Sequence, residues 1–251
     1  MSIAKSIASS VVSSVVSSVA GVGGGAAAPT PWQLLLDDAN LVMRISGDAN
    51  DDGTGDVTDS QGTYNGTWTG TPTYGDPPPN IPGKALDTVS GRYVTFSQAA
   101  TTGLAAWTVC GWIKPRTMFD ANSPWIGALS GNTAPIMRML AAKWQCYAWG
   151  PSGNPVSGLV TSVDVIAVDR WDHISFGYNG TTAFIHVNGV DRTGAGTVLA
   201  SKVLGDNASY ALRIGGGATG SSTPFNGFTS DTRIYSRALT VAESLVLATG
   251  V

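Results

Sequence analysis

Side-chain oxygens between residues 48 and 59 form the most specific chemical pattern in this sequence. Counted from Asp48, oxygen-bearing side chains stand at positions 1, 3, 5, 9 and 12, and glycine stands at position 6. Calcium loops of the Asp-x-Asn-x-Asp-Gly type share this spacing, because the glycine permits a sharp turn and alternate carboxylates then point at one centre. The spacing predicts a structural calcium ion. Its ligands would be Asp48, Asn50, Asp52, Asp56 and Asp59.

Two features of the loop depart from that pattern. The last position holds Asp59 where such loops place a longer, bidentate glutamate, and no helical pattern flanks the loop. A solvated turn therefore stays open as the alternative, since Asp, Asn and Gly are the residues that turns select.

Catalytic residues are not expected. Glycosidase chemistry needs two carboxylates that flank a bond at a defined separation. The single glutamate, Glu243, falls in a predicted terminal helix, and no expected strand carries paired acids on one face. His173 and His186 have no cysteine or carboxylate at ligand spacing, and His173 is expected to be a packed strand residue. The sequence thus predicts a protein that is not an enzyme.

Aromatic side chains offer a second kind of chemistry, because the C–H faces of sugars stack on exposed rings. Trp144, Tyr147 and Trp149 cluster around one expected strand. Alternation places Tyr147 and Trp149 on one face of that strand and Trp144 on the other. We predict these three residues to bind a glycan, with burial in a sandwich core as the alternative.

The composition indicates that these residues are carried on strands. The chain has 251 residues with 32 Gly, 13 Pro and only 12% charged residues, so it is rich in turns and poor in helix-surface residues. The 8 Trp and a hydrophobic fraction of 43% supply a core. A net charge of −3, without any run of Lys or Arg, argues against nucleic acid as a partner.

Short apolar runs bounded by turn formers predict an all-β, antiparallel sandwich or barrel. Strands are expected at 41–45, 93–96, 107–114, 137–140, 145–149, 173–178, 184–188, 211–214 and 229–235. The Asn-Gly pairs at 179–180 and 188–189 predict hairpin turns, because both residues accept positive φ at low cost. One short C-terminal helix is expected, with Thr240 and Glu243 spaced as a capping box requires.

The two cysteines, Cys110 and Cys146, do not define a disulfide framework. They are expected to be small apolar core residues. A single bridge between neighbouring strands stays open, provided that the two Cα atoms lie close enough.

Residues 2–21 form an internal repeat with a step of four. This period is closer to the 3.6 residues of a helical turn than to the period of 2 of a strand. Ser and Val are mediocre helix formers, so the isolated segment would be marginally stable. We expect residues 1–22 to be a helical or extended assembly arm that is ordered by packing against copies of itself, with a trimer as one form. The contacts would be made by Ile3, Ile7, Val11, Val15 and Val19.

Other interpretations of this segment remain. Lys5, the apolar stretch and the small residues 21–28 suggest a cleaved secretory signal peptide, although paired serines dilute its apolar region. A membrane span is disfavoured because half of the positions are Ser, Lys or Gly, and plain disorder is the third possibility. The Gly, Ala and Pro residues of 23–31 predict a linker, which leaves 32–251 as the globular domain.

Several motifs, in order, resemble the concanavalin A-like jelly rolls of the laminin G-like superfamily over residues 36 to 250. They are Asp59-Ser60-Gln61-Gly62, the aromatic strand 107–115, Trp171-x-His173, Val187-Asn188-Gly189, Arg213-Ile214-Gly215 and the closing segment 225–235. The resemblance implies an antiparallel jelly-roll β-sandwich. It also implies Asp231 as a ligand of a structural calcium ion, since such domains often use an acidic residue near the last strand.

The order of arm, glycine-rich hinge and jelly roll resembles that of bacteriophage virion proteins. This layout implies a head-decoration or tail-fibre protein, located in the virion, that is anchored to other virion proteins by its arm and displays the jelly roll. A host-surface glycan is the candidate ligand, with many copies raising the effective affinity. The alternative is a secreted or cell-surface carbohydrate-binding module.

Overall fold

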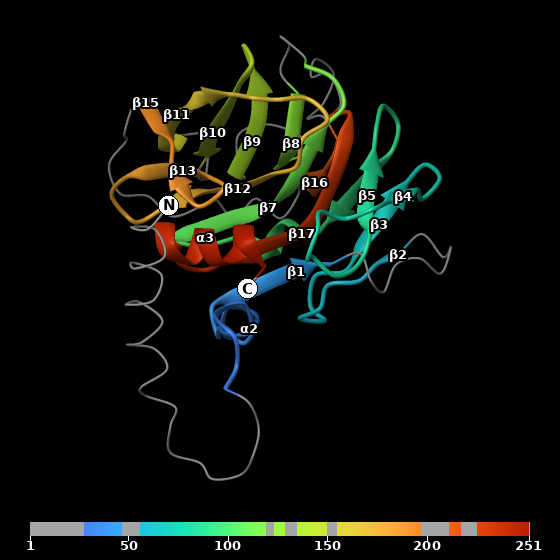
Figure 1. Cartoon of the computed structure of the whole chain (residues 1–251), viewed down its shortest axis with the longest axis horizontal. Coiled ribbons are helices and arrows are strands. Elements are labelled where there is room, and N and C mark those ends of the chain that lie inside the picture. The colour runs from blue at the N-terminus through green and yellow to red at the C-terminus, as the bar shows by residue number, and fades with distance from the viewer. Residues whose placement is uncertain are drawn as a thin grey trace.

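The chain forms two antiparallel β-sheets packed face to face, with two short helices outside one of them (Figure 1). This computed structural model describes residues 28–46, 56–118, 123–128, 135–149, 155–196, 211–216 and 225–250. Within these ranges the chain is an all-β jelly-roll sandwich, as the sequence predicts.

The described elements follow one another along the chain. They are α2 (Pro31–Leu36), β1 (Leu41–Ile45), β2 (Asp56–Val57), β3 (Gly66–Thr69), β4 (Tyr74–Gly75), β5 (Ala85–Thr88), β6 (Tyr93–Phe96), η1 (Gln98–Ala100), β7 (Trp107–Pro115), β8 (Ser123–Ala128), β9 (Pro135–Leu140), β10 (Lys143–Trp149), β11 (Pro155–Val165), β12 (Asp172–Tyr178), β13 (Ala183–Val187), β14 (Val190–Asp191), β15 (Thr193–Gly196), β16 (Leu212–Ile214), β17 (Gly227–Tyr235) and α3 (Val241–Thr249).

The strands of the two sheets come from interleaved parts of the chain. Sheet A has the order β14-β13-β12-β7-β17-β5-β4, with β1 also paired to β17, and sheet B has the order β15-β11-β10-β9-β8-β16-β6-β3-β2. The chain crosses between the two sheets several times. Residues far apart in the sequence therefore become neighbours at the ends of the sandwich.

The space between the sheets is filled with aromatic and aliphatic side chains. Trp107 and Trp125 both contact Phe176 edge-on, with ring centroids 5.6 and 6.3 Å apart. Edge-to-face geometry is the arrangement that ring quadrupoles favour. Strand β12 is buried along its whole length, because its inner face meets this core and its outer face lies under helix α3.

The predicted helix cap and hairpins are present. Thr240 and Glu243 form a full capping box at the start of α3. Asn188 and Gly189 both have positive φ, at 51° and 72°, as a two-residue turn of the mirror-image type requires. The other turn is a longer loop, in which the Asn179 side-chain oxygen accepts hydrogen bonds from the backbone N–H groups of Thr181 and Thr182.

Helix α2 was not predicted, since its first residue falls at the end of the expected linker. Thr30 caps the helix by accepting a hydrogen bond from the Gln33 N–H, and Pro31 is the first helical residue. A capping residue followed by proline is a known helix-start signal, so this element was detectable.

The predicted strands all overlap observed ones, and several further strands were missed. Among the missed strands, β3 and β5 have four residues each, and β11 lacks a clear alternation of apolar residues. Cys110 and Cys146 are both buried and free, in sheet A and sheet B respectively. The alternative of a disulfide bridge is therefore wrong.

The predicted arm lies outside the described residues. The assembly contacts of Ile3, Ile7, Val11, Val15 and Val19, and the hinge up to residue 27, stay predictions. Of the helices in the described ranges, neither is long and apolar enough to cross a membrane.

Candidate functional site

A hollow of about 480 Å³ opens at one end of sheet A, where β12 begins and the β13–β14 hairpin turns. We call it the terminal hollow. Its lining includes Arg170, Trp171, Asp172, Asn188, Val190 and Arg192. The family motifs place these residues together, because Trp171 precedes β12 and Asn188 forms the hairpin turn that pairs with it.

The polar groups of the terminal hollow hold one another in fixed positions. The Arg170 guanidinium donates to both oxygens of Asp172, at 3.0 Å from Nε and 2.8 Å from Nη2. Asn188 donates from its amide to Asp172 at 2.8 Å and accepts from the His173 N–H at 2.8 Å. Asp172 is buried whereas the Arg170 side chain is 58% exposed. The hollow therefore presents the exposed Arg170 side chain and the ring of Trp171 to solvent, with Asp172 ion-paired beneath them.

A second hollow of about 580 Å³ lies beside the outer face of the same hairpin. Its lining includes Phe184, His186, Asp191, Thr193 and Val241. Two of its polar side chains form hydrogen bonds within the protein. Thr193 bonds the backbone of Ile185, and His186 shares a hydrogen bond with Ser244 at 2.9 Å. The terminal hollow is thus the better candidate for a polar ligand.

The aromatic site predicted on the strand at 145–149 is only partly described. Trp144 is 2% exposed and belongs to the core between the sheets, so its ring cannot stack on a sugar and this prediction is wrong. Tyr147 and Trp149 belong to β10, but their side chains lie outside the described residues and their role stays a prediction.

The calcium prediction needs correction at Asp59. Its carboxylate accepts four backbone hydrogen bonds, from Arg44 and Gln61 at one oxygen and from Thr63 and Tyr64 at the other, at 2.9 to 3.2 Å. These four N–H groups occupy the carboxylate lone pairs of Asp59 to which a cation would otherwise bind. Asp59 therefore organises the Asp-Ser-x-Gly turn and is not available as a metal ligand.

Asp231 needs the same correction for an electrostatic reason. One oxygen accepts a hydrogen bond from Arg44 at 2.8 Å and the other from Arg233 at 2.7 Å. Burial alone would raise the pKa of Asp231, but the two guanidiniums outweigh it and hold the pKa below its ordinary value. Two fixed positive charges exclude a cation from this carboxylate.

The remaining predicted calcium ligands cannot be placed in the same way. Asp48, Asn50 and Asp52 lie outside the described residues, and so does the side chain of Asp56, whose backbone begins β2. No group of three or more metal-binding side chains occurs within the described ranges. A calcium ion at this loop stays a prediction.

His173 is a packed residue of sheet A. His173 is buried against Trp112, with ring centroids 5.4 Å apart. Burial lowers its pKa to about 3, with Asp231 opposing the shift and Arg233 adding to it. The ring is therefore neutral at ordinary pH, and the expectation that His173 is a packed residue is confirmed.

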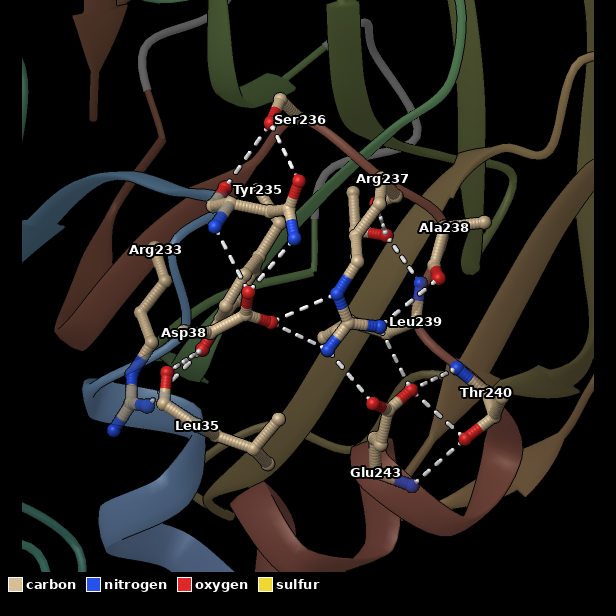
Figure 2. Close-up of polar contacts among 12 residues, drawn as sticks. Leu35, Asp38, Arg233, Tyr235, Ser236, Arg237, Ala238, Leu239, Thr240 and Glu243 are labelled. Atoms are coloured by element: carbon tan, nitrogen blue, oxygen red, sulfur yellow. Dashed lines mark hydrogen bonds and ion pairs between the residues drawn. The ribbon is translucent and has the colours of Figure 1, made fainter. Parts of the chain in front are cut away.

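A clasp of charged residues joins the segment after α2 to the start of α3 (Figure 2). Arg237 donates to Asp38 through Nε at 2.8 Å and to Glu243 through Nη2 at 2.7 Å. Tyr235 adds a hydrogen bond from its hydroxyl to the Leu35 carbonyl at 3.0 Å. Sequence analysis did not detect this clasp, because Asp38 and Arg237 are 199 residues apart.

We expect Arg237→Gln to lower the free energy of unfolding by about 1–2 kcal/mol at pH 7, since two partly buried carboxylates lose their shared donor. Burial raises the pKa of both Asp38 and Glu243, but hydrogen bonds and Arg237 lower each one overall. A lowered pKa stabilises the fold above the ordinary pKa and loses that contribution as the pH falls. Urea unfolding followed by tryptophan fluorescence should show the difference between the two proteins shrinking below about pH 4. An undiminished difference at pH 3 would contradict this account.

The antiparallel sandwich defines a jelly-roll fold, and the comparison with family models shows to which superfamily the chain belongs. Residues 88–243 match the model of the concanavalin A-like lectin/glucanases superfamily. The chain belongs to this superfamily, as the sequence motifs predicted. No curated protein sequence matches the chain.

Solved structures share the fold at low sequence identity. Domain 4 of AbnA, an extracellular arabinanase of Geobacillus stearothermophilus solved with arabinotriose, is 22% identical with a TM-score of 0.60, over 83% of this chain and 98% of that one. The binding domain of botulinum neurotoxin DC, solved with SialylT, is 11% identical with a TM-score of 0.60, over 84% and 51%. Trypanosoma rangeli sialidase is 19% identical with a TM-score of 0.57, over 91% of this chain and 34% of the sialidase. The chain therefore spans about half of the toxin domain and a third of the sialidase.

Proposed function

We propose that this chain is a non-enzymatic, glycan-binding jelly roll that uses the terminal hollow as its binding site. The observation that carries the proposal is the half-buried Trp171 beside Arg170 in the terminal hollow. Hydrogen bonds between the polar side chains of the hollow, such as that from Arg170 to Asp172, hold these side chains in place. An aromatic face with fixed polar neighbours is the combination that a sugar ring needs. Domain 4 of AbnA, solved with arabinotriose, supports the same class of ligand.

The hollow also favours binding over catalysis. Of the described residues that line it, Asp172 is the one carboxylate, and it is buried and bonded to Arg170 and Asn188. Glycoside hydrolysis by the common mechanisms needs two carboxylates about 5–9.5 Å apart across the bond. A polysaccharide degradation assay on the intact protein should show no reducing ends above background.

We expect Trp171→Ala to weaken glycan binding by about 2 kcal/mol, roughly 30-fold, since tryptophans buried by a ligand commonly contribute this much. A glycan array should identify the ligand, and isothermal titration should measure the loss. Trp171→Phe retains a ring and should keep part of the affinity.

Phe184→Ala, in the second hollow, is the matched control. Both variants should unfold in urea in one cooperative transition, as the wild-type protein is expected to do, which reports an intact fold. If Phe184→Ala abolishes binding while Trp171→Ala does not, the ligand occupies the second hollow and the proposed site is wrong.

For the biological setting, we propose a bacteriophage virion protein that displays the jelly roll from its N-terminal arm. The four-residue repeat of residues 2–21 supports this role, and so does the glycine-rich hinge after it. Removing residues 1–28 should leave a folded monomer, and unchanged assembly by light scattering would contradict the role of the arm. The second candidate, a secreted carbohydrate-binding module, is favoured by the likeness to a domain of an extracellular enzyme. Mass spectrometry of the mature N-terminus separates the two.

A further inference from the structure

Aromatic and cationic side chains line up across three neighbouring strands at the end of sheet A. We call Lys114, Arg116, Arg170, Trp171 and Phe228 the aromatic–cationic strip. Lys114 pairs with Phe228 between β7 and β17. Asp172 of β12 pairs with Ile113 of β7. Because the two strands are antiparallel, Trp171, one residue before Asp172, lies opposite Lys114, one residue after Ile113. The strip therefore runs out of the terminal hollow along the outer face of the sheet.

The two rings of the strip lie side by side, and two of its cations lie over the ring of Phe228. The Trp171 and Phe228 ring centroids are 6.4 Å apart. The Arg116 guanidinium lies 4.0 Å from the Phe228 ring centre and the Lys114 ammonium lies 6.0 Å from it. Cations held over rings in this way stay ordered and partly desolvated, so they are prepared to bind an anion.

Cations outnumber carboxylates on this surface, although the whole chain carries a net charge of −3. The two carboxylates that contact the strip, Asp87 and Asp172, are buried, and each is bonded to an arginine of the strip. Asp169, at the turn before β12, is the exposed acid next to it in the chain. In the part of the chain that the structure describes, Lys114 forms no ion pair, and Arg192 adds a further cation at the far wall of the terminal hollow.

From these observations we infer that the ligand of the terminal hollow and the strip is an acidic saccharide whose sugar rings carry carboxylate groups. This inference rests on the glycan-binding function proposed above. Rings such as Trp171 and Phe228 stack on sugar C–H faces, while guanidinium groups donate two parallel hydrogen bonds to a carboxylate. A neutral sugar would use the aromatic half of the surface and would offer no counter-charge to Lys114, which forms no ion pair among the described residues.

Oligogalacturonate and the same oligosaccharide fully methyl-esterified form the sharpest pair of probes, because the rings are the same and only the charge differs. We expect the free acid to bind at least about tenfold more tightly, the factor that one charge-assisted hydrogen bond supplies. Raising the salt concentration should weaken binding of the acid and leave the ester unchanged. Equal affinity for both probes would overturn the inference.

Lys114→Gln should weaken binding of the free acid by about tenfold and leave the ester unaffected. The matched control is Lys143→Gln, which removes a lysine of β10 in the other sheet and should change neither affinity. Single-stranded DNA is the counter-probe, and DNA binding as tight as that of the acid would mean a general anion surface and would overturn the saccharide assignment. Binding of neutral glycans alone would refute this inference while the proposed function stands; binding of no saccharide would refute both.

Discussion

Asp231→Asn is expected to lower the free energy of unfolding by about 3–5 kcal/mol, because it leaves buried guanidinium groups without a counter-charge. Arg233 is 1% exposed and Arg44 is 12% exposed, so neither can turn fully to water. Asparagine is the appropriate replacement since Asp231 has a φ of 48°, and asparagine tolerates positive φ. Urea unfolding at pH 7 measures the loss.

Asp172→Asn is the matched control for this substitution. Asp172 is also buried and bonded to an arginine, but the Arg170 side chain is 58% exposed and can regain water. Its loss should be about 1 kcal/mol, in the range of surface ion pairs. Equal losses for the two variants would show that burial of the guanidinium does not decide the effect.

The second large effect is expected at Asp59. Asp59→Ala removes the acceptor of four backbone N–H groups in a turn that is partly closed to water, and we expect a loss of about 3 kcal/mol. Asp59→Asn should lose less, because its amide oxygen still accepts while its NH₂ group faces two donors.

The same experiment separates the hydrogen-bonding role of Asp59 from a metal-binding role. The loss measured for Asp59→Ala should be equal with and without a chelator, since no ion takes part in these four bonds. A loss that vanishes in chelator would restore Asp59 to the calcium site. Asp37→Ala is the control, because Asp37 is an exposed acid that bonds only the Gln33 side chain among the described side chains, and it should have almost no effect.

Features coded by neighbouring residues were predictable from the sequence. A tight two-residue hairpin turn requires positive φ at both central positions, and Asn188-Gly189 supplies the two residue types that accept it at low cost. Thr240 and Glu243 satisfy two helix donors reciprocally, so the start of α3 was placed correctly. The strand at 41–45 was found because its apolar residues alternate, and the structure gives it the same bounds.

Features that depend on distant segments were not predictable in the same way. Alternation put Trp144 on the face opposite Tyr147, but it did not say which face meets the core. The family resemblance implied Asp231 as a calcium ligand, and nothing near it in the sequence indicates its partner Arg44, which is 187 residues away. The absence of a Lys or Arg run likewise concealed the aromatic–cationic strip, whose cations come from separate segments that sheet A brings together.

The attachment of helix α2 has a mechanical consequence. The Tyr235 hydroxyl and Arg237 tie α2 and the residue that follows it to the C-terminal end of β17, and β17 is an interior strand of sheet A. Tension that enters the chain at Thr30 would therefore reach the interior strand β17 through these side-chain bonds before it pulls on β1, which among the described strands pairs only with β17. A tether attached at this point would pull first on the middle of sheet A.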